Sequence, residues 1–426
     1  MKKLSFIILI ALTSCLVGCS KKSDTQTTTV TTTTTSTTPV TPPATSADGD
    51  VVGKLVVGYQ GWFSANGDGS PSNSWNHQNI EIWPDTREYT NTYSGSPFKQ
   101  NGGVTQPPFT GNMGNGNPAV MFSSYDQSTV NTHFLWMQQN GIDCVALQRF
   151  GSELSNTTLK AQRDGMAAKV RSAAEATGRK FYIMYDISGW TSFQTQIKTD
   201  WTSDMSALTL SSAYAMQNGK PVVCVWGPGF SSRPGNVTSW TDVLAWFKTQ
   251  GCYVIVGAPS SFVSDVTNRT AYNTANMIMP WMVGNNTNFS NFQSQNANNL
   301  SYCNSYGIDY QADIYPGFAF YNSDLTKPKN EIPRAHGDFM WSQFAAAKSA
   351  SVKSVYISMF DEINEATAIF KCAEDATMSP VGEYFLTLDA DGTHVSSDFY
   401  LRLTNNGQKM MKGTIPYTAT NPTSFQ

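Results

Sequence analysis

Two glutamates, Glu362 and Glu365, stand three residues apart in the segment MFDEINEATAIF (359–370), after the strand-forming run SVYIS. A carboxyl pair can act as acid and base on a glycosidic bond at separations of about 5–5.5 Å in retaining enzymes or about 6.5–9.5 Å in inverting ones. Residues three apart in an extended strand are separated by roughly 10 Å and point to opposite faces. In a helical turn their β-carbons lie about 5–6 Å apart on one face. We therefore expect the chain to leave the strand near Glu362 and curl; otherwise Glu365 only caps or solvates a surface loop.

Aromatic and polar side chains gather at the ends of the other predicted strands. Aromatic rings stack on the apolar faces of sugars, and a few placed polar groups bind sugar hydroxyls. The residues at these ends include Tyr59, Trp62, Trp75, His77, Gln148, Arg149, Asp186, Trp190, Trp226, Trp281 and Phe318. Any one of these rings could simply pack in the core or a loop, but several together at strand ends favour a carbohydrate ligand.

Eight short apolar segments must position these side chains. The predicted strands are 54–63, 143–150, 180–187, 221–227, 252–259, 277–284, 313–321 and 354–362. Most are continuously apolar, which is typical of strands covered on both faces. The predicted helices between them are 127–140, 157–178, 202–217, 238–250 and 335–350.

Strands that alternate with helices in this way predict a (β/α)8 barrel, here with enlarged βα loops, whose site lies at the C-terminal ends of the strands. The rival fold is an open doubly wound sheet. That fold usually carries a glycine-rich phosphate loop after its first strand, and the segment that follows 54–63 has glycines but no GxGxxG before a helix.

The N-terminus resembles a bacterial lipoprotein signal. Lys2 and Lys3 precede a short apolar run that ends in Leu-Val-Gly-Cys at Cys19. The run is too short to span a membrane, so we expect residues 1–18 to be a signal peptide and Cys19 to be lipidated. An ordinary cleaved signal is the alternative. Because Ser20 rather than Asp follows the cysteine, we expect anchoring in the outer membrane of a Gram-negative cell envelope.

The predicted domain organisation follows from composition. Residues 19–51 form a Thr/Pro-rich tract that cannot bury a core and predicts a disordered tether. Residues 52–415 form the barrel, and residues 416–426 a C-terminal tail.

Charge and cysteine content argue against several other classes of protein. The net charge is −3 and the basic residues are scattered, so no nucleic-acid surface is expected. With four histidines and no CxxC, we expect neither a metal nor another cofactor. We expect Cys144, Cys224 and Cys252 to be buried thiols, whereas Cys303 and Cys372 could pair. The chain is expected to be a monomer.

The segment at 359–370 resembles the strand-eight motif S-F-N-E-W-H-E-G-T of glycoside hydrolase family 99, the endo-α-mannosidases and endo-α-mannanases. Four other segments follow the family's order: FSSYDQSTVNTHFLWMQQNGIDCVALQRF (122–150), Trp75-Asn76-His77, Pro316-Gly317-Phe318 and Arg334-Ala335-His336-Gly337. The resemblance covers about residues 55–371.

This resemblance implies a retaining mechanism. Glu362 would be the base that removes the proton of the sugar's own 2-hydroxyl, giving a 1,2-anhydrosugar, and Glu365 would be the general acid and then the base for water. Asp186, Tyr59 and Arg334 match active-site positions of the family. The substrate-binding set is then Tyr59, Trp62, Trp75, His77, Arg149, Asp186, Trp226, Phe318 and Arg334.

Several residues depart from the family's pattern. Ile363 and Asn364 replace Trp-His, Ala366 replaces Gly, Phe318 replaces Tyr, and Arg149 stands near an expected tryptophan. The residues expected around the substrate therefore differ from those of the family. The chain resembles a divergent group of family 99/71-like lipoproteins, some labelled xylosidase/arabinosidase.

Three functions remain open from the sequence: a glycoside hydrolase, a catalytically silent glycan-binding lipoprotein, and a structural surface protein. Carboxyl groups that face one cavity favour the hydrolase. Carboxyl groups that point apart favour binding alone, and a shallow mouth without exposed aromatics favours a structural role.

Overall fold

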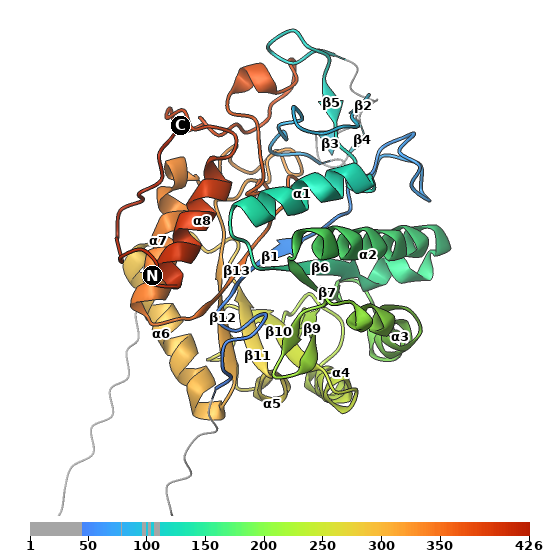
Figure 1. The fold of residues 1–426 in the computed structure, drawn as a ribbon, viewed down its shortest axis with the longest axis vertical. Helices are drawn as coiled ribbons and strands as arrows, with labels where there is room; N and C mark the ends of the chain where they lie inside the picture. Colours follow the sequence, from blue (N-terminus) through green and yellow to red (C-terminus); the bar gives the residue numbers. More distant parts are fainter. Residues whose placement is uncertain (1–44, 78, 96–98, 101–103, 106–110) are drawn as a thin grey trace, which may run out of the picture. The chain divides into compact units, whose positions relative to one another are not determined.

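The computed structural model describes residues 45–77, 79–95, 99–100, 104–105 and 111–426 of the 426-residue chain (Figure 1). The predicted signal peptide 1–18, Cys19 and most of the predicted tether lie outside the described residues. No helix within the described ranges is long and apolar enough to cross a membrane.

Eight parallel strands close into a barrel. They are β1 (Leu55–Tyr59), β6 (Cys144–Phe150), β7 (Lys180–Asp186), β9 (Lys220–Trp226), β10 (Tyr253–Pro259), β11 (Met277–Trp281), β12 (Asp309–Ile314) and β13 (Ser354–Ile357). Each strand pairs with the next in this order, and β13 pairs back with β1, so no edge is left open. The predicted (β/α)8 barrel is therefore confirmed, and the open doubly wound sheet is wrong.

Helices surround the barrel, as Figure 1 shows. They are α1 (Gln127–Gln139), α2 (Thr157–Thr177), α3 (Phe193–Asp200), α4 (Val237–Thr249), α5 (Arg269–Thr274), α6 (Phe289–Tyr306), α7 (Asp338–Ser349) and α8 (Phe399–Met411). Capping residues set the ends of α2. The Asn156 side chain accepts the backbone N–H groups of Thr158 and Leu159 at the start of α2, and Gly178 ends that helix at φ 67°.

Short elements complete the chain. The turns are η1 (Gly151–Ser155), η2 (Trp201–Met205, a π-turn), η3 (Ser206–Leu210), η4 (Ala335–Gly337) and η5 (Ala376–Met378). Two antiparallel pairs lie in the long segment between β1 and α1, namely β2 (Tyr93–Ser94) with β5 (Val120–Met121) and β3 (Lys99–Gln100) with β4 (Val104–Thr105). A third strand pair joins β8 (Met216–Gln217) to β9.

The seventh strand is four residues earlier than predicted. The prediction at 313–321 followed an apolar run, whereas β12 is DYQADI, in which Asp309, Gln311 and Asp313 are buried. Each buried acid has donors: Asp309 accepts from the Tyr253 hydroxyl at 2.5 Å, and Asp313 accepts from the Ser358 hydroxyl at 2.6 Å. Paired polar side chains can occupy a core, and a hydrophobicity pattern does not reveal the pairing.

Two helix predictions also need correction. The predicted helix at 202–217 is wrong, because α3 begins upstream at Phe193, the chain tightens through η2 and η3, and Met216 already pairs with β9. Helix α6 was not predicted, because its buried face is polar. On that face, the Tyr310 hydroxyl donates to Asn296 at 2.8 Å and accepts from Asn299 at 3.1 Å.

Both ends of the described chain pack on the barrel. The Ser46 N–H donates to Asp309 at 2.8 Å, and Val51 and Val52 are buried. At the other end, the Trp341 indole donates to the carbonyl of Thr418. The domain limits at residues 52 and 415 themselves stay predictions.

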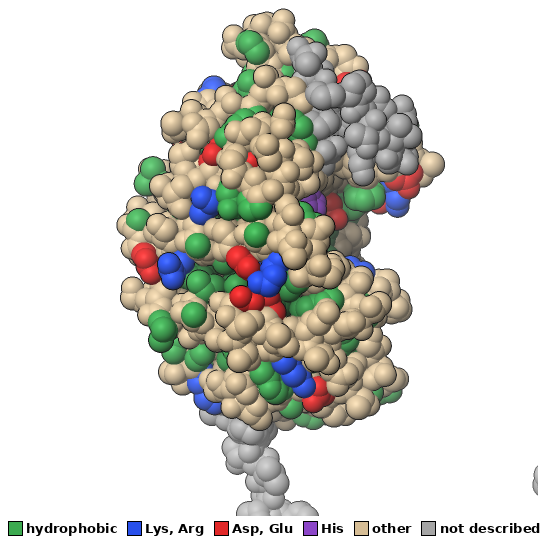
Figure 2. Space-filling model, turned by 90° about the vertical axis from the view of Figure 1, so that its right-hand side faces the viewer, with side chains coloured by type: hydrophobic (Ala, Val, Ile, Leu, Met, Phe, Trp, Pro, Cys, Tyr) green, Lys and Arg blue, Asp and Glu red, His purple; other side chains and the backbone are tan. Residues whose placement is uncertain are grey.

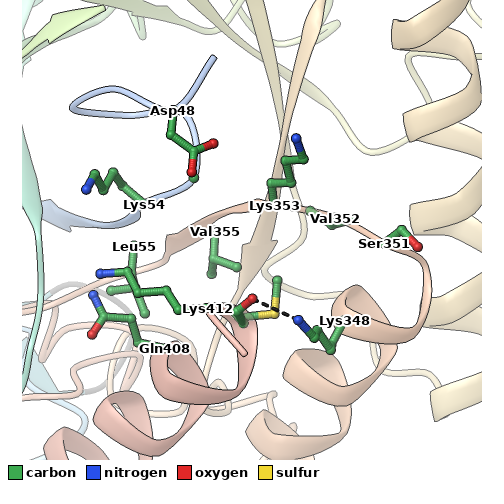
Figure 3. A pocket seen from close by; sticks show the side chains of 12 residues that line it. Asp48, Lys54, Leu55, Lys348, Ser351, Val352, Lys353, Val355, Gln408 and Lys412 are labelled. Atoms are coloured by element: carbon green, nitrogen blue, oxygen red, sulfur yellow. Dashed lines mark hydrogen bonds between the residues drawn. The ribbon is translucent and has the colours of Figure 1, made fainter. Parts of the chain in front are cut away.

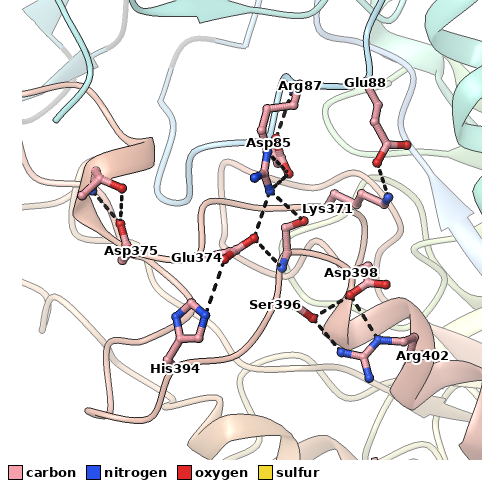
Figure 4. Close-up of polar contacts among 12 residues, drawn as sticks. Asp85, Arg87, Glu88, Lys371, Glu374, Asp375, His394, Ser396, Asp398 and Arg402 are labelled. Carbon is pink, nitrogen blue, oxygen red and sulfur yellow. Dashed lines mark hydrogen bonds and ion pairs between the residues drawn. The ribbon is translucent and has the colours of Figure 1, made fainter. Parts of the chain in front are cut away.

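A network of ion pairs joins the segment after β1 to the C-terminal part of the chain (Figure 4). Arg87 contacts Asp85 at 2.7 Å and Glu374 at 2.9 Å, and Glu374 also contacts His394 at 3.5 Å. On the face drawn in Figure 2, acidic and basic side chains lie in small mixed groups among uncharged ones.

Candidate active site

A cavity of about 220 Å³ lies at the C-terminal ends of the strands. Its lining comes from the ends of four strands and from the loops after β1, β7, β9 and β13: Gln60, Trp62, Gln148, Phe150, Met184, Asp186, Ser188, Trp226, Arg233, Trp281, Met359, Glu362 and Glu365. This is the end at which barrel enzymes carry their sites. A larger cavity lies at the opposite end of the barrel and contains none of these residues.

The loop after β13 brings the two glutamates to this cavity. The strand ends at Ile357, earlier than predicted, and residues 363–366 form a turn. The N–H groups of Thr367 and Ala368 both donate to the carbonyl of Glu362, which closes the turn. The predicted curl is therefore present, and Glu362 and Glu365 line one cavity.

Asp361 ties this loop to the end of β1. Its two carboxylate oxygens accept the backbone N–H groups of Gln60 at 2.8 Å and Gly61 at 2.9 Å. Its side chain is fully buried, and this burial raises the pKa of Asp361 to about 7. The two hydrogen bonds fix the position of the neighbouring Glu362.

Glu362 is buried and accepts two hydrogen bonds. The donors are the backbone N–H of Asn364 at 2.7 Å and the side-chain amide of Gln60 at 3.1 Å. Burial, followed by the charges of Glu365 and Asp361, raises the pKa of Glu362 well above its usual range. The two donors act in the opposite direction, because they stabilise the ionised form.

Glu365 faces the cavity, and the charge of the Arg233 guanidinium acts on it. Burial raises the pKa of Glu365 to about 7, although the charge of Arg233 acts to lower it. Arg233 follows β9 and lies over the Trp226 ring, with its guanidinium carbon 4.9 Å from the ring centroid. Burial of the two carboxyl groups therefore favours retention of a proton by the pair.

Asp186 lies at the end of β7 and is held by its neighbours. It accepts the Gln148 amide at 2.9 Å and the backbone N–H of Ser188 at 2.7 Å. Burial raises the pKa of Asp186 above its usual value, and Arg233 acts against this rise.

Aromatic rings form two walls. Trp62 stacks on His77, with centroids 3.8 Å apart, and on Phe150 at 4.8 Å. On the other wall, Trp226 meets Trp281 edge to face at 5.3 Å. Such rings offer flat apolar surfaces beside the carboxyl pair.

Five buried polar atoms of the cavity lining have no hydrogen-bond partner among the described residues. They are Gln60 Oε1, Trp62 Nε1, Gln148 Oε1, Trp226 Nε1 and Arg233 Nε. A buried polar atom without a partner costs about 1–3 kcal/mol. Two acceptor oxygens and three donor nitrogens around one small cavity suit a ligand that carries several hydroxyl groups.

Of the predicted site residues, Trp62, Asp186, Trp226, Glu362 and Glu365 line the cavity. Three others lie outside its lining. His77 stacks on Trp62, and the buried Tyr59 donates or accepts a hydrogen bond with His133 at 2.9 Å. Arg334 donates to the carbonyls of Ala366 at 2.8 Å and Ala368 at 2.6 Å, so it braces the loop that carries the glutamates.

Three predicted residues are not at the cavity. Arg149 is 2% exposed and is paired with Asp200 at 2.5 Å and Asp164 at 2.8 Å, on the helix side of β6. Neighbouring residues of a strand point to opposite faces, so Gln148 faces the cavity and Arg149 cannot. Phe318 stacks on Phe320, and Trp75 packs against the main core.

Sequence reasoning assigned no role to Gln60, Gln148, Phe150, Met184, Ser188, Arg233, Trp281 or Met359. Gln148 and Trp281 do stand at the ends of predicted strands, and Arg233 carries a usable signal in the sequence. It is the only charged residue in the loop GPGFSSRPGN (227–236), which follows a predicted strand.

Other predicted chemistry can be placed as well. Cys144, Cys224, Cys252, Cys303 and Cys372 are all buried free thiols, so Cys303 and Cys372 do not pair. Among the residues that the structure describes, no cluster of three or more His, Cys, Asp or Glu side chains could hold a metal ion.

Comparison with known proteins supports the fold. No protein-family model matches the chain, and no curated protein matches it. Two solved structures of the glycoside hydrolase family 99 endo-α-mannosidase of Bacteroides thetaiotaomicron, one in complex with bis-tris-propane, match with TM-scores of 0.61 and 0.60 at 13% and 14% identity. Each match covers 85% of this chain and 98% of the other.

A third structure, described as a glycoside hydrolase-like protein, matches with a TM-score of 0.52 at 13% identity and covers 86% of this chain and 96% of the other. The resemblance found in the sequence is therefore confirmed at the level of the fold: the chain forms a family-99-like (β/α)8 barrel.

Proposed function

We propose that the protein is a retaining glycoside hydrolase that acts on a polysaccharide or glycan. The observation that carries this proposal is the cavity itself, in which two carboxyl groups share a small space with indole rings and five unpartnered buried polar atoms. A sugar ring would place hydroxyls against those atoms and its C–H faces against the indoles. The fold shared with glycoside hydrolases supports the same conclusion.

Each glutamate has a separate role in the proposed reaction. Glu362 removes the proton of the sugar's 2-hydroxyl, and the resulting oxygen attacks C1 to close a 1,2-anhydrosugar. Glu365 gives its proton to the departing glycosidic oxygen. In the second step Glu365 takes a proton from water, the water oxygen opens the ring at C1, and Glu362 returns its proton to the 2-oxygen. Two successive displacements at C1 retain its configuration.

The hydrogen bonds of the pair support this division. When the two groups share one proton, the negative charge is better placed on Glu362, which has the Gln60 amide and the Asn364 N–H as donors. The Glu365 carboxyl group accepts no hydrogen bond from the described residues, and with a pKa of about 7 it is suited to giving and taking a proton near neutral pH.

The test is hydrolysis of a polysaccharide panel by the full chain and by its Glu362→Gln and Glu365→Gln variants. Loss of general acid–base catalysis lowers rates by about 10²–10⁴-fold, so we expect kcat/KM to fall by that factor in each variant. Glu383→Gln is the matched control, because Glu383 is exposed and does not line the cavity. Binding of oligosaccharide by calorimetry should survive in both cavity variants.

Two outcomes would contradict the proposal. Full activity in both cavity variants would contradict the catalytic roles assigned to Glu362 and Glu365. A wild-type chain that binds an oligosaccharide but releases no reducing sugar would indicate a glycan-binding protein on the same barrel.

The proposal extends to location. The Leu-Val-Gly-Cys motif supports a chain held at the cell envelope through lipid on Cys19. Substituting Cys19→Ala should move the protein from the membrane fraction to the soluble fraction of the cell. Retention of the variant in the membrane fraction would argue against the lipid anchor.

A further inference from the structure

A second cavity lies at the N-terminal ends of β1 and β13, away from the candidate active site. It has a volume of about 440 Å³, and Figure 3 shows side chains around it from several different elements. Four lysines line it: Lys54 before β1, Lys348 in α7, Lys353 before β13 and Lys412 after α8. The protein as a whole has a net charge of −3, so this concentration of cations is local.

Two of the four lysines have structural partners. The Lys348 ammonium donates to the carbonyl of Met411 at 2.9 Å, at the end of α8, and Lys412 contacts Asp143 at 3.0 Å. Cations near helix C-termini are stabilising, so these two contacts need no ligand to explain them. An ammonium carries three donors, and Lys348 uses one of them on Met411.

The other two lysines carry the inference. Neither the Lys54 side chain nor the Lys353 side chain makes a hydrogen bond, ion pair or ring contact with any other described residue. Asp48 is the only carboxylate in the lining, and Asp143 lies behind Lys412. Four cations against two carboxylates leave the cavity electropositive, which favours the binding of an anion.

The rest of the lining is apolar. Leu55, Val352 and Val355 are buried beneath the lysines, and Met411 completes this floor. An inorganic anion would gain nothing from this apolar floor. The glycerol or acyl group of a phosphate ester would pack against it. Lysine ammonium groups bind phosphate as point charges.

The position of the cavity fits this ligand. Asp48 and Gly53 line it, and Ser46 is hydrogen-bonded to Asp309 at the start of β12. Cys19, the proposed lipid anchor, lies 29 residues before Asp48 in the sequence. The chain therefore enters the barrel at the same end as the lysines.

We propose that this cavity binds a phosphate ester, with Lys54 and Lys353 taking the phosphate and the apolar floor taking the group attached to it. The ligand class is that of a phospholipid head group or a soluble glycerol phosphate. The inference does not depend on the proposed hydrolase activity, since no residue is shared between the two cavities.

The test uses the full chain with Cys19→Ala, so that no lipid is attached, and vesicles of phosphatidylcholine with or without phosphatidylglycerol. Each basic side chain near an anionic surface contributes about 1 kcal/mol. The double substitution Lys54→Gln and Lys353→Gln should therefore weaken binding to the anionic vesicles about thirtyfold. The control, Lys327→Gln and Lys329→Gln, removes two exposed lysines in the loop after β12.

A second arm separates the two sources of phosphate. The melting temperature is measured with glycerol phosphate for the same proteins. Stabilisation that requires Lys54 and Lys353, without vesicle binding, would support a soluble phosphate ester as the ligand. Vesicle binding that requires them would support a lipid. The proposal is overturned if neither probe binds, or if the control variant loses as much binding as the cavity variant.

Discussion

At the mouth of the barrel, where the strands have their C-terminal ends, carboxylates and indole rings line a cavity of about 220 Å³. At the base, where β1 and β13 begin, lysines line a cavity of about 440 Å³. The charges differ in more than sign. At the mouth, Glu362 and Asp186 are buried and hydrogen-bonded. At the base, Lys353 is exposed and makes no polar contact with the described residues.

This difference matters because burial changes what a charge can do. A buried carboxyl has a perturbed pKa and can transfer a proton, which is why perturbed groups gather at active sites. An exposed ammonium keeps its charge and can only attract. The larger cavity is thus suited to holding an anion, and the smaller one to chemistry.

The largest expected effect separates the roles of the two glutamates. Glu365→Gln removes the proton donor for the leaving group, so an aryl glycoside with an acidic phenol should restore much of the roughly 10²–10⁴-fold loss. Glu362→Gln removes the base, and the same substrate should restore little. Comparing kcat/KM for aryl and sugar leaving groups measures this, and equal rescue of both variants would contradict the assignment.

The next effect concerns pH. Burial raises the pKa of Asp313, near the mouth, to about 7 from 3.8. The folded state then holds a proton that the unfolded state releases, so its contribution to stability is present below about pH 4 and is lost as pH rises towards 7. The loss is on the order of 4 kcal/mol for a shift of this size.

Asp313→Asn mimics the protonated acid and is the variant that isolates this contribution. Urea unfolding at pH 5 and pH 8 should show the wild type losing more stability than the variant as pH rises. The substitution Asp324→Asn, at a half-exposed carboxyl in the loop after β12, is the control. A wild type and variant with parallel pH profiles would show that Asp313 is ionised in the folded protein throughout this range.

A smaller effect is expected in the loop that carries the glutamates. Ala366 has φ 51°, in the left-handed region, where a side chain costs roughly 1–2 kcal/mol. Glycine avoids this cost but loses more entropy on folding. We expect Ala366→Gly to stabilise the protein by about 0.5–1 kcal/mol, measured by thermal unfolding. Ala368→Gly, at a residue of the same loop with ordinary φ, should destabilise it instead.

The smallest expected effect is no change. Lys54→Gln with Lys353→Gln should leave kcat/KM for a hydrolysed glycan within about twofold, because surface substitutions far from a site rarely change it. Glu365→Gln should likewise leave vesicle binding unchanged. A change in hydrolysis by the lysine variant, or in vesicle binding by the Glu365→Gln variant, would show that the two ends of the barrel are coupled.

The barrel could be predicted because its strands are continuous apolar runs. Composition alone indicates a buried strand in the segments LVVGY and YVIVGAP. β12 and α6 could not be located in this way, since Asp309 and Asn296 are buried against hydroxyl groups that come from elsewhere in the sequence. Long-range polar pairing leaves no local pattern.

The site was predicted in part for a related reason. Glu362 and Glu365 could be chosen because their spacing and motif are local. Arg149 was misplaced by a single residue: its neighbour Gln148 faces the cavity, and only the orientation of β6 decides between the two. Arg233 reaches the cavity from a loop whose path depends on the packing of Trp226 and Phe230.

The attachment of residues 46–52 to the barrel has a consequence for release of the protein. The Ser46 N–H is bonded to Asp309, and Val51 and Val52 are buried. A protease that cuts the chain before residue 45 would leave this attachment in place. The released fragment would keep both cavities, so shedding by proteolysis would free an intact barrel from its proposed anchor.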